Sequence, residues 1–422
     1  MNAPAAYLKR MEERLPDFAA YAACLSLPPY KGIRVNTLKI SAEEFAGISP
    51  FSLSPVPWEA SGYYIAEEKP GRSAYHDAGL FYVQEPSAMC AAPLLDVRPG
   101  ERVLDLCAAP GGKGTQLAQA MGGQGILVLN EKIPARAKIL LQNVERMGIT
   151  NAVVTCADPE TIAERFEGYF DKVLVDAPCS GEGMLRKEEE AAANWSPENV
   201  AMCAARQKKL LDSAARTVRA GGQLVYSTCT FAEEEDEENA AGFLARHPEF
   251  TLMEQKKIYP HREKGEGHFA ALFVREGESC CRLRPGKERA ERQALSAFSA
   301  FADAFLKERP AGRAISFGES LCAVPEDLFS LDGLRVLRAG LALGSVRGGR
   351  FEPAHALALA APGYFREKAD YTQEEISRYL HGEEMPCMLR GWCAVSVDGF
   401  PVGLGKAVGG VLKNHYPKGL RR

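Results

Sequence analysis

The stretch KVLVDAPCSG, residues 172–181, decides the fold that we predict for this chain. Its apolar run Val173–Val175 is typical of a strand that is buried on both faces of a parallel sheet. Because the carboxyl ends of such strands form the ligand crevice of a doubly wound sheet, Asp176 and Cys179 are predicted to line it. The residues alone leave a second interpretation open, in which the proline and glycine form a turn and Cys179 is a buried thiol without chemistry.

Strands and helices alternate on both sides of this stretch. Strand patterns occur at residues 103–106, 126–129, 152–155, 173–175, 224–227 and 269–274, and helical patterns at 113–121, 133–147, 197–220 and 232–246. The long third helix is predicted to begin at the cap Ser196 and to stop at Gly221-Gly222. The alternation predicts an α/β fold with a parallel, Rossmann-like sheet that is covered by helices.

The flanking regions differ from this core. Residues 1–88 have a mixed α+β pattern, and residues 84–89 are predicted to open an apolar helix with Pro86 in its first turn. A basic connector spans residues 280–293, a helix is expected at 294–307, and a hairpin around Asp398-Gly399 predicts a small β module. We therefore expect four domains, with the bounds 1–88, 89–279, 280–378 and 379–422.

The composition is that of a soluble globular protein. The chain has 422 residues, 25% of them charged, and a net charge of −4, so any nucleic-acid binding must use local basic patches. We find no signal peptide and no membrane span. Twelve cysteines without a Cys-x-x-Cys pair predict free thiols in the cytoplasm and no zinc site or other bound metal. We expect a monomer.

Three strand ends carry residues suited to a nucleoside. The first strand runs into Cys107-Ala108-Ala109-Pro110-Gly111-Gly112-Lys113, a glycine turn that brings backbone N–H groups to a ligand, although its spacing fits neither a dinucleotide fingerprint nor a P-loop. Glu131 ends the second strand, where a carboxylate accepts hydrogen bonds from ribose hydroxyls. Asp158 follows the third strand, where it could hold an adenine amino group. The alternative for each acid is a helix cap.

A second thiol, Cys229, follows the strand at 224–227, and we expect it to lie over the same crevice as Cys179. Thr230 and Glu233 have the spacing of a capping box, which predicts a helix N-terminus directly after Cys229. Such a position lowers the pKa of a thiol.

The C-terminal segment forms a local basic patch. No acidic residue follows Asp398, whereas four basic residues there are candidates for RNA phosphate contacts: Lys406, Lys413, Lys418 and Arg421. The alternative is a solvated basic tail.

Several motifs together resemble the Sun family of RNA cytosine-5 methyltransferases. They are residues 34–37 (RVNT), 84–89 (QEPSAM), 107–113 (CAAPGGK), 176–183 (DAPCSGEG) and 226–230 (YSTCT). The tail at 412–421 (LKNHYPKGLR) is similar to the bacterial RsmF-like branch, whose C-terminal module resembles a PUA domain. One departure is Gly114, where the family more often has Thr or Ser, and we expect it to loosen the start of the helix.

The resemblance implies a methyltransferase that uses S-adenosylmethionine as its cofactor and 16S ribosomal RNA as its partner. It implies that Cys229 attacks carbon 6 of cytosine as the nucleophile, so that carbon 5 can accept the methyl group, and that Cys179 assists release of the product. It implies that Asp176 contacts both the cytosine base and the cofactor. It also implies that Glu131 binds the ribose of the cofactor, Asp158 its adenine, and the turn at 107–113 its amino-acid end. It also implies that residues 1–88 bind RNA.

Two other functions remain open from the residues. A methyltransferase that acts on amino groups would need a polar residue and an aromatic at the fourth strand, where this chain has Pro178-Cys179. A non-catalytic RNA-binding assembly factor could keep the fold without needing both thiols and three acids.

Overall fold

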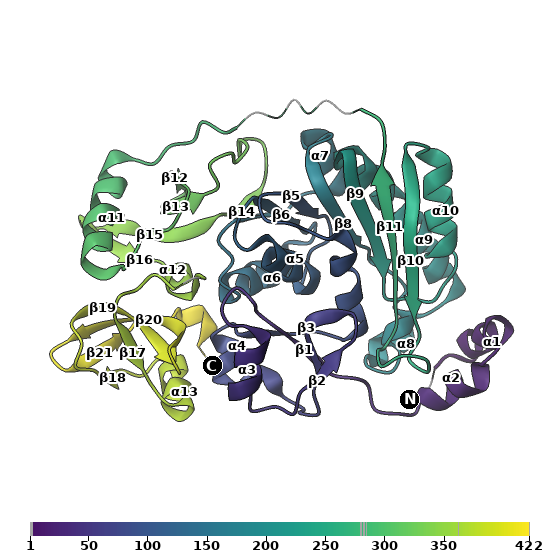
Figure 1. The fold of residues 1–422 in the computed structure, drawn as a ribbon, viewed down its shortest axis with the longest axis horizontal. Helices are drawn as coiled ribbons and strands as arrows, with labels where there is room; N and C mark the ends of the chain where they lie inside the picture. Colours follow the sequence, from purple (N-terminus) through teal and green to yellow (C-terminus); the bar gives the residue numbers. More distant parts are fainter. Residues whose placement is uncertain (1–2, 279–280, 282, 284, 362, 422) are drawn as a thin grey trace.

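The computed structural model describes residues 3–278, 281, 283, 285–361 and 363–421. Its centre is an eight-stranded sheet with the order β10-β11-β9-β8-β5-β6-β7-β14 (Figure 1). The five inner strands from β9 to β7 run parallel, and the other three are antiparallel to their neighbours. The strands are β5 (Arg102–Asp105), β6 (Ile126–Asn130), β7 (Ala152–Thr155), β8 (Phe170–Asp176), β9 (Val218–Thr228), β10 (Phe250–Ile258), β11 (His268–Arg275) and β14 (Val336–Ala339).

Helices cover both faces of this sheet. One face packs on α7 (Pro159–Arg165), α9 (Pro197–Thr217) and α10 (Glu237–Arg246), and the other on α5 (Gly112–Met121) and α6 (Pro134–Arg146). Alternate residues of the inner strands feed the two cores: Val173 and Val175 belong to the first and Leu174 to the second. The parallel strands are therefore buried on both sides, as their continuous apolar runs predict.

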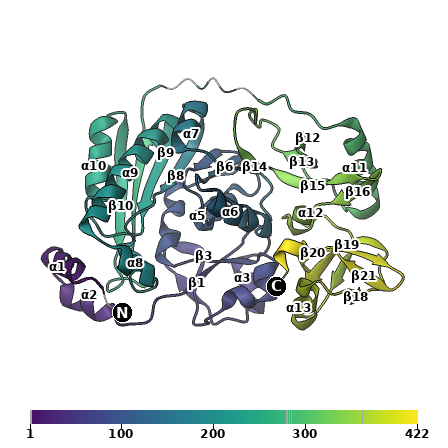
Figure 2. The ribbon, with the colours of Figure 1, turned by 180° about the vertical axis from the view of Figure 1, so that it is seen from behind.

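The N-terminal region has two parts. Helices α1 (Ala5–Arg14) and α2 (Phe18–Cys24) form an arm that packs beside α8 (Glu189–Asn194) and the 3₁₀ turn η4 (Glu182–Met184) (Figures 1 and 2). A four-stranded sheet follows, with the order β2-β3-β1-β4. Its elements are β1 (Gly32–Val35), α3 (Ala42–Ile48), β2 (Ser54–Val56), β3 (Glu59–Tyr64), η1 (Pro70–Arg72), α4 (Ala74–Asp77) and β4 (Phe81–Val83).

Two further sheets make up the C-terminal part. One has the order β12-β13-β15-β16 and packs on α11 and α12; the other has the order β17-β19-β20-β21-β18 and packs on α13. The bounds are α11 (Arg292–Phe305), β12 (Arg313–Phe317), β13 (Ser320–Val324), β15 (Leu341–Arg347), β16 (Arg350–Pro353), α12 (His355–Leu359), β17 (Lys368–Asp370), α13 (Gln373–His381), β18 (Met385–Pro386), β19 (Gly391–Val397), β20 (Phe400–Val408), β21 (Val411–Asn414) and η5 (Lys418–Leu420). The predicted hairpin at Asp398-Gly399 joins β19 to β20.

The apolar helix predicted from residues 84–89 is wrong. The segment contains two short 3₁₀ turns instead, η2 (Ser87–Cys90) and η3 (Ala92–Leu95). Pro93 lies in the first turn of η3, and a proline ring cannot continue an α-helix that arrives from the preceding residues.

The predicted end of the third helix at Gly221-Gly222 is also wrong. Helix α9 begins at the Ser196 cap, as predicted, but ends at Thr217, and both glycines lie within β9. The register between β8 and β9 shifts there, from Phe170 opposite Val218 to Lys172 opposite Gln223. The glycines therefore serve a bulge, in which Gly221 has φ +72°.

The capping box predicted at Thr230 and Glu233 does not form. Helix α10 begins at Glu237, after Asp236, and the Thr230 hydroxyl is hydrogen-bonded to the hydroxyl of Ser180. Cys229 is thus separated from the helix N-terminus by a turn and does not lie within the reach of the helix dipole.

The predicted connector at 280–293 is described only in part, because residues 279, 280, Arg282 and Arg284 lie outside the described residues. Within the described part of the chain, no helix is long and apolar enough to cross a membrane.

Candidate functional site

The two thiols meet where the neighbouring strands β8 and β9 end. Asp176 and Ser227 are register partners at the carboxyl ends of these strands, and the chain then turns back on each side. The Sγ atoms of Cys179 and Cys229 lie 3.2 Å apart, and the Cys229 N–H also donates to Cys179 Sγ over 3.4 Å. The hydrogen bond to Cys229, together with burial, raises the pKa of the Cys179 thiol. Both thiols therefore lie over one crevice, as the strand order predicts.

Asp176 is paired with the lysine of the glycine turn. Lys113 Nζ lies 2.8 Å from Asp176 Oδ2, and the Ser227 hydroxyl donates to Oδ1 over 2.9 Å. Burial opposes ionisation of Asp176, but the Lys113 ammonium outweighs it and lowers the pKa of the carboxyl. An ion pair thus joins the end of β8 to the start of α5, beside the thiols.

His268, which the sequence did not single out, also reaches this pair. Its Nε2 lies 3.9 Å from Asp176 Oδ1, and burial lowers the pKa of the imidazole to about 3. The ring is therefore neutral at physiological pH. It comes to the crevice because β11 runs antiparallel to β9, so that its first residue lies at the carboxyl ends of the parallel strands.

The glycine turn is contacted by Asp105, at the end of β5, and by Arg34 of the N-terminal sheet. Gly111 has φ +115° and precedes α5, a conformation that suits glycine. The Cys107 N–H donates to Asp105 Oδ1 over 3.3 Å, and burial raises the pKa of the Cys107 thiol. From the N-terminal sheet, the Arg34 guanidinium donates to Gly112 O and Thr115 Oγ1 over 2.9 and 2.7 Å.

Gly114 does not loosen the start of the helix, because α5 begins at Gly112 and continues through it. A Cβ atom there would lie 2.7 Å from Leu129 Cδ2 and 3.1 Å from Asp105 Oδ2. The glycine thus matches the close approach of α5 to the sheet.

The two acids of the next strand ends have different surroundings. Glu131 is almost fully buried, lies 3.3 Å from Arg136 and accepts the Ile133 N–H over 2.8 Å. Asp158 is half exposed and forms the N-terminal cap of α7 by accepting the Glu160 N–H over 3.2 Å. Its ion pair with Lys132 and this cap lower the pKa of the Asp158 carboxyl. Asp158 is therefore a helix cap, which is the alternative that the sequence left open. Glu131 is not a cap of this kind, since its carboxylate binds the N–H of Ile133, which precedes α6.

The C-terminal basic residues do not form one uniform set. Lys406 lies 5.4 Å above the Trp392 ring, and it is the register partner of Lys413 across β20 and β21. Lys413 and Lys418 are exposed. Arg421 instead folds over Gly382 at the end of α13 and donates to Tyr416 O over 3.4 Å. Two of the four predicted residues are thus free to meet a ligand, and Arg421 has an intramolecular role.

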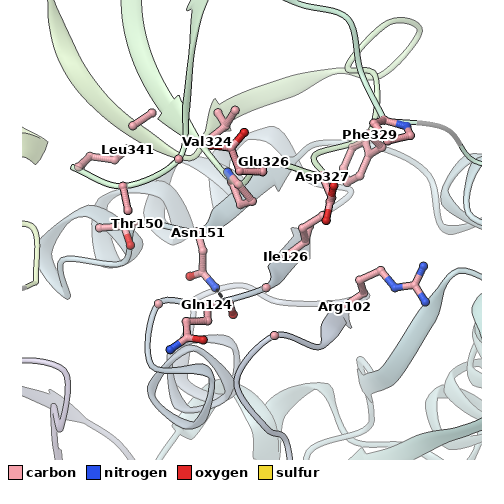
Figure 3. Close-up of a pocket in the computed structure, with 18 of the residues that line it drawn as sticks. Arg102, Gln124, Ile126, Thr150, Asn151, Val324, Glu326, Asp327, Phe329 and Leu341 are labelled. Carbon is pink, nitrogen blue, oxygen red and sulfur yellow. Dashed lines mark hydrogen bonds between the residues drawn. The ribbon is translucent and has the colours of Figure 1, made fainter. Parts of the chain in front are cut away.

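A cavity of about 670 Å³ lies elsewhere, between the central sheet and the β12–β16 sheet (Figure 3). Arg102 and Ile126 line it from the first residues of β5 and β6. It therefore opens at the amino ends of the parallel strands, the edge opposite to the thiols, and is separate from the crevice.

Four family models match the chain in succession. They describe the N-terminal domain of 16S rRNA methyltransferase RsmF (residues 3–86), 16S rRNA methyltransferase RsmB/F (92–274), the RsmF rRNA methyltransferase first C-terminal domain (300–360) and the methyltransferase RsmF PUA domain (366–422). Together with the sheet order, they confirm the predicted fold class: a Rossmann-like methyltransferase core with an N-terminal domain and a PUA-like C-terminal module.

Known proteins are similar to this chain over nearly its whole length. Ribosomal RNA small subunit methyltransferase F of Klebsiella pneumoniae is 34% identical over 99% of this chain and 96% of its own length, and that of Shigella boydii is 33% identical over the same shares. Among solved structures, a methyltransferase homologue from Pyrococcus horikoshii is 26% identical with a TM-score of 0.57, covering 64% of this chain and 99% of its own. The crystal structure of PH0851 is 33% identical with a TM-score of 0.62, covering 65% and 66%.

Proposed function

Because the chain belongs to the RsmF family of 16S rRNA methyltransferases, we propose that it methylates carbon 5 of a cytidine in 16S ribosomal RNA, with S-adenosylmethionine as the methyl donor. One observation carries the choice of cytosine carbon 5: two thiols 3.2 Å apart at the ends of neighbouring strands. Methyl transfer to an amino group needs no thiol nucleophile, whereas carbon 5 of cytosine must first be activated by addition at carbon 6.

The proposed roles of the thiols follow from this chemistry. The thiolate of Cys229 adds to carbon 6, and the electrons of the C5=C6 bond move toward carbon 5, which becomes nucleophilic. S-adenosylmethionine, when bound, supplies the electrophilic methyl group that carbon 5 takes up, with the neutral thioether S-adenosylhomocysteine as the leaving group. The thiolate form of Cys179 then removes the proton from carbon 5 and becomes a neutral thiol; the freed electron pair restores the double bond, and the bond between carbon 6 and Cys229 breaks to regenerate the Cys229 thiolate.

The donor set in the crevice fits the proposed cofactor. Lys113 and Asp176 present an ammonium and a carboxylate side by side, which are complementary to the carboxylate and amino group of the methionine end. The backbone of residues 107–113 approaches the same place at the start of a helix, and Glu131 offers a carboxylate for the ribose hydroxyls. We propose that Asp158 faces the adenine with Oδ2, the oxygen that does not take part in the cap and that pairs with Lys132.

The RNA is proposed to lie across the N-terminal and C-terminal parts. We propose the four-domain division 1–88, 89–279, 280–378 and 379–422, with the first and last domains binding RNA. Lys406 and Lys413 are directly opposite on adjacent strands, an arrangement of like charges that a phosphate would relieve. The target base must leave its stack, or be single-stranded, before its ring can reach the thiols.

The test is methylation of 16S ribosomal RNA by the wild-type enzyme and by Cys229→Ala and Cys179→Ala, read by bisulfite sequencing and on denaturing gels. We expect no 5-methylcytosine with Cys229→Ala, since no adduct can form. We expect Cys179→Ala to accumulate a covalent protein–RNA species, since release loses its base. Full activity of Cys229→Ala would disprove the nucleophile assignment, and a methylated amino group instead of carbon 5 would disprove the reaction.

A further inference from the structure

A buried polar cluster lies beneath the two thiol loops, and its centre is Glu235, whose side chain is fully buried. We propose that Glu235 is a positioning residue that holds the Cys179 loop against Cys229 and thereby sets the rate of product release. The inference rests on the proposed function, but it concerns a residue that neither the motifs nor the strand ends pointed to.

Glu235 fixes the Cys179 loop on both sides of the thiol. Its Oε2 accepts the backbone N–H of Ser180, the next residue, over 3.0 Å. The same oxygen accepts the side-chain amide of Gln207 over 2.7 Å, and that amide also donates to the carbonyl of Pro178, the residue before the thiol, over 3.0 Å. One carboxylate oxygen thus determines, directly or through Gln207, where both neighbours of Cys179 lie.

The same residue belongs to the segment that follows Cys229. The hydroxyl of Tyr226, in β9, donates to the Glu235 carbonyl, and the Glu235 N–H donates to Ala232 O over 3.1 Å. A second link between the loops joins the hydroxyls of Ser180 and Thr230 over 2.8 Å. Glu235 therefore connects the loop of one thiol to the loop of the other, and the 3.2 Å distance between the Sγ atoms depends on that connection.

The contacts require an acceptor oxygen and not a charge. Burial raises the pKa of Glu235, against the hydrogen bonds from Ser180 and Gln207, and its other oxygen, Oε1, has no hydrogen-bond partner among the described residues. A glutamine can present its carbonyl oxygen to the same two donors. An alanine leaves the Ser180 N–H and one donor position of Gln207 without an acceptor in a buried place.

Positioning matters most for the release half of the reaction. Carbon 5 and carbon 6 are bonded neighbours, so Cys179 must approach one while Cys229 is bound to the other. A displacement of about 1 Å in a reacting group can cost about a hundredfold in rate. Addition requires only that the Cys229 loop is correctly placed. Release also requires that the Cys179 loop holds its thiol close to carbon 5 while Cys229 is bonded to carbon 6. Loss of Glu235 should therefore leave addition in place and slow release.

The experiment compares Glu235→Ala, Glu235→Gln and Gln207→Leu with wild type, and uses Glu238→Ala as the control, because Glu238 is exposed on α10 three residues away. The first measurement is turnover on 16S ribosomal RNA, with the fraction of enzyme trapped as a covalent adduct on a denaturing gel. We expect Glu235→Ala to turn over roughly a hundredfold more slowly with adduct accumulating, Gln207→Leu to change in the same direction, and Glu235→Gln to remain within a few-fold of wild type.

The second measurement needs no RNA. Diamide takes two hydrogens from a pair of close thiols and joins them as a disulfide, so the rate at which it links the Cys179 and Cys229 peptides, followed by mass spectrometry, reports the distance between the loops. We expect slow linking in Glu235→Ala and Gln207→Leu, and wild-type linking in Glu235→Gln and Glu238→Ala.

The two measurements separate this inference from the proposed function. If Cys179→Ala traps an adduct but Glu235→Ala and Gln207→Leu release and cross-link like wild type, the positioning role is wrong and the reaction stands. If linking is slowed in Glu235→Ala and Gln207→Leu while Cys179→Ala traps nothing, Glu235 positions the loop but the release role of Cys179 fails. Failure of Glu235→Gln to restore either measurement would overturn the claim that an acceptor oxygen suffices.

Discussion

Asp105 shows how a single residue beneath the crevice sets a pH limit on the fold. It ends β5, is almost fully buried, and receives the Cys107 N–H that shapes the glycine turn. Burial, followed by the nearby Asp176 carboxylate, raises the pKa of Asp105 to about 8. The carboxyl is therefore neutral in the folded protein at neutral pH, whereas in the unfolded chain it ionises above pH of about 4.

We predict that this difference makes the wild-type protein lose stability as the pH rises from about 4 to about 8. In that window the folded state holds a proton that the unfolded state has released, so each unit of pH costs about 1.4 kcal/mol until the carboxyl ionises in the folded state as well. Asp105→Asn removes this contribution. Urea unfolding of both proteins at pH 5 and pH 8.5 should show a larger drop for wild type, by a few kcal/mol. Equal drops would mean that Asp105 is ionised in the folded state.

The residues of the crevice could be predicted from sequence only where a parallel strand ends in a recognisable motif. Cys179, Cys229, Asp176 and Lys113 all meet that condition, and the structure brings the four together. His268 and Glu235 do not meet it. His268 depends on the antiparallel direction of β11, which apolar periodicity does not give, and Glu235 belongs to the run of acidic residues at 233–238, which follows no strand directly. Only packing distinguishes the one buried glutamate that binds both loops.

At the scale of elements, the central sheet is completed by a strand from far along the chain. β14 pairs antiparallel with β7, the strand that Asp158 follows, and comes from the region between residues 280 and 378. Arg338 anchors it: its side chain is buried and donates to Gly340 O and Ile149 O, each over 2.8 Å, and it lies 3.6 Å from Glu145. The central sheet of the methyltransferase core thus includes an edge strand from outside residues 92–274, the segment that the methyltransferase family model matches.

We predict that Arg338→Met loosens this edge, because the buried Ile149 carbonyl and the Glu145 carboxylate lose their partner. Leaving a buried acceptor without its hydrogen-bond partner lowers the free energy of unfolding by about 1–3 kcal/mol. Urea unfolding should show that decrease, and hydrogen exchange should quicken in residues 152–155, whose outer edge β14 covers. The matched control is Arg335→Met, at an exposed position three residues before Arg338. Unchanged exchange in β7 would mean that β14 adds no protection.

The elements of the parallel core were largely predictable, because each strand is a short apolar run and each helix has its own periodicity. Prediction failed at residues whose type is compatible with two different local structures. Gly221-Gly222 looks like the end of a helix but forms a bulge in β9, and Pro86 looks like the start of a helix but precedes two 3₁₀ turns. Tertiary contacts, and not local propensity, decide between such uses.

At the scale of the whole molecule, the N-terminal sheet and the C-terminal module form one unit. Side chains of both share a core, which includes Phe45 and Phe81 from the first and Tyr379 and Val395 from the second. The Tyr75 hydroxyl also donates to Asp398 Oδ2 over 2.5 Å, across the boundary. Figure 1 shows β20 and α13 beside α4, with the C-terminus between them. The two parts that we propose as RNA-binding domains therefore pack together on a shared core and are not two tethered modules, and we propose that RNA lies across their joint surface.

Because the net charge is −4, RNA binding by this surface must depend on a few local cations, and this gives the last prediction. Of the C-terminal candidates, Lys413 and Lys418 are exposed, whereas Arg421 packs on the end of α13. Lys413→Gln with Lys418→Gln should weaken RNA binding and reduce the slope of log affinity against log salt by up to about 1.4, since each phosphate contact on a single strand contributes about 0.7.

The control, Lys208→Gln with Lys209→Gln, makes the same change of charge on the exposed side of α9, which lies at the opposite end of the molecule from β20 and β21 (Figure 1). Fluorescence anisotropy with labelled RNA at several salt concentrations measures both slopes. A purely global electrostatic effect would lower the slope equally in the two double variants. A local contact surface on the C-terminal module lowers it only in the first, and Arg421→Gln should then reduce the stability of the module while leaving the slope unchanged.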